Sequence, residues 1–291
     1  MLHELSDKTR IYSMSAVHQP ALTINVGDTV RFRTRDCFDG QVPMEENPEN
    51  LDKRAEGRGN PATGPVYVSG AAPGHTLVCT LQDVQLAPQG LICSQRRDGS
   101  ERTVTVVNIE GNMAHMGKWQ FPVEPVVGVM GVAPESGEVP NSTPGPHGGN
   151  MDTADLVIGS KLYLPVFHPG ALFGCGDVHA LQGDGEVCGQ GIEIGAEVTI
   201  GFDLLDRPVC PWPLVETPTH YDIVAAGEDL DEAARFALLA ARDFLIKYAA
   251  ATDQEALVLM STVGDLRICQ IVDPLLGVRA CVPKELITRA L

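Results

Sequence analysis

Short runs of alternating apolar and polar residues, separated by glycine and proline, dominate the first 133 residues of the chain. The run TVRFRTR at 29–35 alternates with a period of two, as a half-buried β-strand does. RTVTVVNI at 102–109 and PVVGVMGVA at 125–133 continue the pattern between turn formers. No helical periodicity competes with it. The first half therefore predicts a β structure of many short strands.

Helical signals gather near the end of the chain. Asp229 and Thr252 are each followed three residues later by a glutamate, which is the capping-box signature of a helix start. Apolar residues at helical spacing follow Asp229, and a terminal helix is expected over 283–291. We therefore predict an α+β fold with a predominantly β body, sandwich- or barrel-like, and helices packed on it, mainly from the C-terminal third.

No linker or internal repeat interrupts the chain. At 291 residues it is long enough to bury one large core. We expect a single domain over 1–291, β-rich over 1–225 and helix-containing over 226–291.

Charge and cysteine usage narrow the possible partners and the compartment. The 38 acidic and 21 basic residues give a net charge of −17, and no Lys/Arg cluster occurs, so nucleic acid and anionic membranes are poor partners. No apolar run approaches the roughly 20 residues of a membrane helix. The first residues are polar where an export signal is apolar, and the eight cysteines form no C-x-x-C pair. We expect a reduced, cytoplasmic protein.

The stretch from 168 to 193 carries the strongest site signal. Asp177, His179, Asp184 and Glu186 fall within ten residues and are separated by glycines, which allow tight turns around a ligand. The same composition also occurs in plain surface turns. Because apolar, strand-like segments frame this stretch on both sides, we interpret it as a site that closes around an ion.

A run of turn formers at 134–152 is the second candidate functional segment. Loops of this length in a compact domain are usually functional or disordered. The run ends in His-Gly-Gly-Asn-Met-Asp at 147–152, and we expect this end to be functional, although a solvated His147 is the competing interpretation.

Five blocks, in order, resemble the acetamidase/formamidase family, which hydrolyses short amides to a carboxylate and ammonia. The blocks are DCFDGQ at 36–41, NPATGPVYVSGAAPG at 60–74, HGGNMD at 147–152, PGALFGCGDVHALQGDGEV at 169–187 and STVGDLRICQIVDP at 261–274. The resemblance implies a β-rich fold with helices, a formamide- or acetamide-like substrate, and a homodimer or higher homo-oligomer.

The resemblance also implies a divalent metal, because metals occur in family structures and amide hydrolysis needs an activated water and a polarised carbonyl. Zinc takes His and carboxylate ligands, and calcium is the alternative. The candidate ligands within or next to the family-like blocks are Asp36, His147, Asp177, His179 and Asp184.

For proton transfer the first candidate is Glu186 and the second Glu193, because a carboxylate beside apolar groups can have a raised pKa. The competing interpretation is that Glu186 orients His179. Asn150 and Gln182 carry amides suited to binding the substrate.

Two alternatives remain open at this stage. A cysteine nucleophile would be Cys175, or Cys37 beside Asp36, although packing explains both thiols. A non-catalytic β module is the other alternative. A cupin-like metal site would want a His-x-His pair, but Asp177 stands two residues before His179. A structural calcium site would explain the Asp-Gly pattern but would not need His147 or His179.

Overall fold

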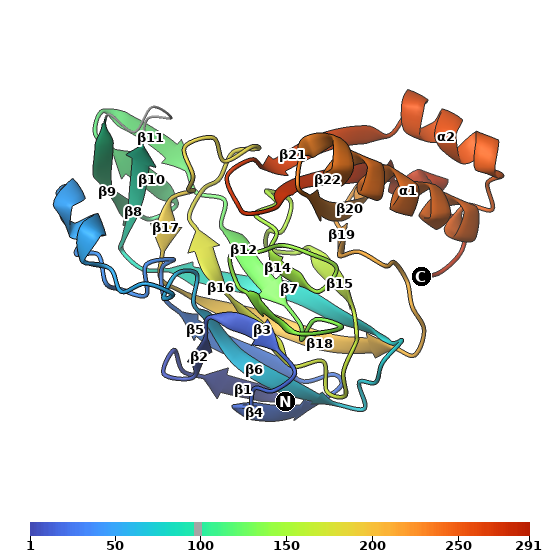
Figure 1. Ribbon diagram of the computed structural model, residues 1–291, viewed down its shortest axis with the longest axis horizontal. Helices are drawn as coiled ribbons and strands as arrows, with labels where there is room; N and C mark the ends of the chain where they lie inside the picture. Colours follow the sequence, from blue (N-terminus) through green and yellow to red (C-terminus); the bar gives the residue numbers. More distant parts are fainter. Residues whose placement is uncertain (96–100) are drawn as a thin grey trace.

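The computed structural model describes residues 1–95 and 101–291, which form two large β-sheets with two α-helices at one end (Figure 1). The nine strands of the first sheet, in spatial order, are β1 (Leu2–Leu5), β5 (Thr29–Thr34), β18 (Ala196–Leu205), β7 (Thr76–Leu86), β15 (Lys161–Pro165), β19 (Leu214–Glu216), β20 (His220–Gly227), β22 (Leu276–Pro283) and β21 (Asp265–Gln270).

The second sheet has eleven strands within the described residues. Its main path is β11 (Trp119–Pro122), β10 (Met113–Met116), β9 (Arg102–Glu110), β8 (Gln89–Gln95), β17 (Glu193–Ile194), β16 (Phe173–His179), β12 (Val126–Gly131) and β14 (Gly148–Asn150). A branch from β16 adds β6 (Ala62–Ser69), β2 (Arg10–Ile11) and β4 (Leu22–Asn25). A small third sheet pairs β3 (Ser13–Ser15) with β13 (Glu138–Pro140).

The main apolar core contains aromatic rings from both large sheets. Phe32 on β5 and Phe202 on β18 meet Phe173 on β16, with ring centroids 5.9 Å and 5.1 Å from that of Phe173. All three rings are essentially buried. Burying a phenylalanine stabilises a fold by about 1.5–3 kcal/mol, so this contact fixes β16 against the first sheet.

The helices α1 (Leu230–Tyr248) and α2 (Asp253–Thr262) begin where the sequence predicts. Asp229 caps α1 by accepting a hydrogen bond from the Glu232 backbone N–H, and Thr252 and Glu255 form a capping box on α2. Helix α1 packs on β20 and β22 (Figure 1). The predicted fold, a β body with helices near the C-terminus, is confirmed.

The predicted terminal helix over 283–291 is wrong. Residue 283 ends β22, and only the three-residue 3₁₀ helix η2 (Lys284–Leu286) follows it. The backbone N–H groups of Thr288 and Arg289 instead donate to the Tyr248 carbonyl at the end of α1. These tertiary hydrogen bonds replace the helical ones. The other 3₁₀ helix, η1 (Pro48–Lys53), lies in the polar segment after β5.

One hydrogen-bonded sheet joins the two predicted parts of the chain. Strands β21 and β22, which follow the helices, pair with each other, and β22 pairs with β20. The single domain over 1–291 stays a prediction that this continuity favours.

Candidate active site

The site is centred on His179, the last residue of β16. Pairing of β16 with β17 sets His179 opposite Glu193, and His179 Nε2 lies 3.2 Å from Glu193 Oε1. Asp177, two residues earlier, has Oδ1 3.7 Å from the same nitrogen. All three side chains are 1–2% exposed. The imidazole therefore faces two buried carboxylates on one side.

The opposite edge of the ring is held by Gln182. Its amide nitrogen donates to the Asp152 carbonyl at 2.7 Å, so its oxygen must face His179 Nδ1, 2.9 Å away. A neutral His179 therefore carries its proton on Nδ1 and presents a lone pair at Nε2. The Asp152 carboxylate lies 4.0 Å from Nδ1.

Two glycines make room for this arrangement. A Cβ atom at Gly128 would lie 2.3 Å from Asp152 Oδ1, and one at Gly191 would lie 2.7 Å from His179 Cγ. Both distances are impossible for real atoms. The charged groups pack directly against backbone at these positions.

Three acids of the site have left-handed backbone, with φ of 40° at Asp152, 55° at Asp177 and 45° at Glu186. A non-glycine residue pays for this conformation, and such residues cluster at functional sites. Asn60, which is also left-handed, donates from Nδ2 to Asp177 Oδ2 at 2.8 Å. The backbone is therefore strained at the residues that contribute these side chains to the site.

Burial changes the protonation of the acids. It raises the pKa of Glu186 to about 8 and that of Glu193 to about 7. The pKa of Asp273 rises to about 8 for the same reason, and that of Asp152 rises well above its usual value. Burial would lower the pKa of His179, but Glu193 and Asp177 outweigh it and raise this pKa well above its usual value. These buried acids therefore keep their protons to a higher pH than exposed acids do.

Several polar atoms here have no hydrogen-bond partner in the protein. Asp152 Oδ1, Asp177 Oδ1 and Glu193 Oε2 are buried and unpaired. Buried polar atoms are normally satisfied, by water or an ion where no protein group serves. Asp152, His179 and Glu186 bring ligand atoms within 4.8 Å of one another, as do Cys37, Asp177 and Glu193. Carboxylate oxygens and an imidazole are a donor set that suits a divalent metal, and zinc in particular.

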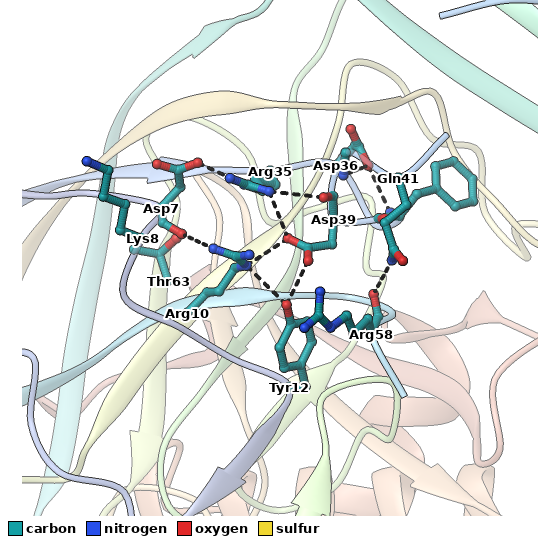
Figure 2. A network of polar contacts seen from close by, with 12 residues as sticks. Asp7, Lys8, Arg10, Tyr12, Arg35, Asp36, Asp39, Gln41, Arg58 and Thr63 are labelled. Atoms are coloured by element: carbon teal, nitrogen blue, oxygen red, sulfur yellow. Dashed lines mark hydrogen bonds and ion pairs between the residues drawn. The ribbon is translucent and has the colours of Figure 1, made fainter. Parts of the chain in front are cut away.

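Three predicted metal ligands lie outside these groups. Asp36 Oδ1 accepts hydrogen bonds from the backbone N–H groups of Phe38 and Gly40, at 2.9 Å and 3.0 Å (Figure 2). Asp184 forms a two-pronged ion pair with Arg279. His147 is buried at a different place, in the wall of a cavity of about 850 Å³ between the 134–147 loop and α1.

Asn150, one of the two predicted substrate-binding residues, has one side-chain amide atom without a hydrogen-bond partner. Its Nδ2 donates to Asp273 Oδ2 at 2.9 Å, and its Oδ1 is buried without a partner. Gln182 is engaged at both ends of its amide. Its contacts support a role in orienting His179.

Asn60 and Asp273 were not among the predicted site residues, and Asp152 was covered only as part of the 147–152 end that was expected to be functional. All three lie inside the family-like blocks. The positive φ values that distinguish Asn60 and Asp152 cannot be read from a sequence.

The structure disfavours a cysteine nucleophile. Burial raises the pKa of the Cys175 thiol, which lies in the main apolar core. Burial, reinforced by Glu193 and Asp177, also raises the pKa of Cys37 well above its usual value. Neither thiol has the positive surroundings that a reactive thiolate requires.

The acetamidase/formamidase family model matches residues 17–143 and 139–211. The chain belongs to the acetamidase/formamidase family. The crystal structure of an acetamidase from Bacillus halodurans superposes with a TM-score of 0.93 at 36% identity, over 97% of each chain.

Two relatives are similar over less of their length. A Schizosaccharomyces pombe protein named "putative formamidase" is 28% identical over 256 aligned positions, and the match covers 65% of this chain and 62% of that protein. A formamidase from Methylophilus methylotrophus is 32% identical over 152 aligned positions, and the match covers 45% of this chain and 37% of that one. The chain thus matches less than two thirds of either relative.

Proposed function

We propose that this protein hydrolyses short linear amides, such as formamide or acetamide, to a carboxylate and ammonia. The observation that carries the proposal is the buried group of acids around His179, with carboxylate oxygens that no protein donor satisfies. Family membership supports the reaction class.

We assign His179, Asp152 and Asp177 as the residues that would hold a divalent metal, most plausibly zinc. The Gln182 contact engages His179 Nδ1, so that Nε2, which faces the Glu193 and Asp177 carboxylates, would be the coordinating atom, and Asp152 and Asp177 each have an unpaired oxygen. A bound metal would polarise the amide carbonyl and lower the pKa of a water. Calcium is the weaker choice because it takes oxygen ligands only.

Glu186 and Glu193 are the candidate proton carriers. A carboxyl with a pKa of about 8 or 7 can accept a proton from the attacking water and return it to the departing ammonia near neutral pH. Because Asn150 Oδ1 is buried without a partner, we assign it the role of accepting an N–H of the substrate amide. Hydrogen bonds to Asn60 and Gln182 hold Asp177 and His179 during these transfers.

Ammonia release from a panel of short amides tests the reaction, and exhaustive chelation followed by metal add-back tests the metal. We expect turnover to disappear on chelation and to return with zinc. His179→Ala should lose both bound metal and turnover, because an alanine offers no ligand atom. Ammonia release by fully demetallated protein would remove the metal from the proposal, and no release from any amide with metal supplied would support a binding module instead.

We also propose assembly into a homodimer or higher homo-oligomer. Strand β21 is the edge of the first sheet, and Leu266 and Ile268 on it are 47% and 40% exposed. Exposed apolar side chains on an unpaired strand edge favour pairing with another chain. Light scattering would measure the mass of the particle in solution, and a monomer would contradict the proposed assembly.

Cytoplasmic location stays a prediction. Within the described residues, no helix is long and apolar enough to span a membrane.

A further inference from the structure

Arg279, on β22, is the only arginine or lysine that is buried within the described part of the chain, with 1% exposure. Its two terminal nitrogens each lie 2.9 Å from an oxygen of Asp184. Its Nε lies 2.5 Å from Asp155 Oδ2, as an ion pair whose N–H is not aligned for a hydrogen bond. Nη1 also donates to the Ile268 carbonyl at 3.2 Å. One buried guanidinium thus joins two acids from distant segments.

Each of these two acids lies within three residues of an acid of the candidate site. Asp184 is two residues before Glu186, and Asp155 is three residues after Asp152. The Asp184 turn is also tied to β21, because the Gly185 N–H donates to the Cys269 carbonyl at 2.9 Å and the Gly185 carbonyl accepts from Ile271 at 3.2 Å. The C-terminal strands therefore hold both segments.

Glu186 and Asp152 both have a backbone conformation that their surroundings must stabilise. Glu186 has φ of 45° and Asp152 has φ of 40°, and neither is a glycine. Residues persist in this region when their surroundings fix them there. Arginine suits the task because its planar, permanently charged fork can hold one carboxylate at two points and meet a second with Nε.

We propose that Arg279 is a positioning residue that sets the placement of Asp152 and Glu186 through Asp155 and Asp184. The inference rests on the proposed function, since it concerns the same site. Arg279 itself touches none of the reacting groups assigned above.

Arg279→Lys tests the proposal, because lysine keeps the charge but cannot reproduce the fork. We expect kcat to fall about 10- to 100-fold, in line with the cost of misplacing catalytic groups by about 1 Å, while KM changes less than about threefold. The matched control is Arg267→Lys. Arg267 is opposite Arg279 in the β21–β22 pairing but is exposed and paired with Asp265, so its kinetics should equal those of the parent.

A triple variant, Arg279→Met with Asp155→Asn and Asp184→Asn, separates positioning from charge balance. Removing all three charges should recover thermal stability lost in Arg279→Met alone, because the Asp155 and Asp184 carboxylates, which are 28% and 43% exposed, no longer lack a partner. We expect kcat of the triple variant to stay low. Recovery of kcat together with stability, or parental kcat in a folded Arg279→Lys protein, would overturn the proposal.

Amide hydrogen exchange tests the inference independently of turnover. In Arg279→Lys, the amides of 152–155 and 183–189 should exchange faster than in the parent, and those of β18 should not change. Unchanged exchange in both segments overturns the positioning role. A parent that releases no ammonia but shows the exchange difference would refute the proposed function and leave the positioning role standing.

Discussion

Two groups of buried acids lie in this molecule, and they are satisfied in opposite ways. Buried Asp39 and partly exposed Asp7 both meet bases: Arg10 lies 2.8 Å and Arg35 3.3 Å from Asp39, the Tyr12 hydroxyl donates to Asp39 at 2.7 Å, and Asp7 pairs with Arg35 (Figure 2). We call this group the Asp39 network.

Around His179, four buried carboxylates share one imidazole: Asp152, Asp177, Glu186 and Glu193. Burial of a charge is costly unless a partner compensates for it. The Asp39 network is compensated within the chain, so it needs nothing else to be stable. The His179 site has only one imidazole for four buried carboxylates, and burial outweighs its effect, so the pKa values of Glu186 and Glu193 are raised and a further cation would complement the site.

The sharpest test of this contrast is Glu186→Gln. The amide keeps the shape of the side chain but carries no proton, so we expect the metal to remain and kcat to fall about 10²–10⁴-fold. Metal content and rate should be measured on the same sample, with Glu197→Gln, at a partly exposed residue paired with Arg33, as the control. Turnover within a few-fold of the parent would move the role to Glu193, and loss of metal would make Glu186 a ligand or its support.

Asp39→Asn tests the other side of the comparison. It removes the acid that two arginines share, so the free energy of unfolding should fall by about 2–3 kcal/mol, less than for a fully buried pair because Arg35 is one third exposed. Denaturant unfolding measures this change. Turnover per folded molecule should stay within a few-fold of the parent. A large loss of kcat in the folded variant would show that the Asp39 network serves the site.

The smallest effect is the pH dependence of the metal-stripped protein. Glu186, Glu193 and Asp273 have folded pKa values of about 8, 7 and 8, above their unfolded values of about 4. Between pH 5 and 7 the folded state therefore binds more protons than the unfolded state. Stability should decrease as pH rises, by about 1.4 kcal/mol per pH unit for each extra proton.

Zinc at saturating concentration should weaken this pH trend, because it compensates the ionised acids. Denaturant midpoints from pH 5 to 9, with and without zinc, measure it. Stability of the stripped protein that increases from pH 5 to 7 would contradict the raised pKa values.

Sequence reasoning went furthest where the signal was local. The period-two alternation predicted the strands, and the caps at Asp229 and Thr252 predicted the helix starts. The cluster of acids with His179 was recognised because Asp177, His179 and Glu186 are close in the chain.

The site also needs residues whose proximity only the tertiary fold creates. Asp184 has the same glycine context as Glu186, but Arg279, 95 residues further along, draws it away from His179. Asp152 lies at the 147–152 end that was expected to be functional, but it was not predicted as a ligand, since its approach to His179 depends on Gly128 and Gln182. Neither relation follows from local pattern, because each depends on which strands pair.

The hydrogen bonds between Gly185 and the end of β21 have a consequence for the order in which the protein folds during synthesis. A ribosome must add about 90 further residues after the central turn before Cys269, Ile271 and Arg279 can meet it. Contacts between residues so distant in the chain form late, because closing a long loop costs entropy before any contact repays it. The nascent chain would thus carry its acids without their final arrangement, and the two sheets would be largely synthesised before the site is completed.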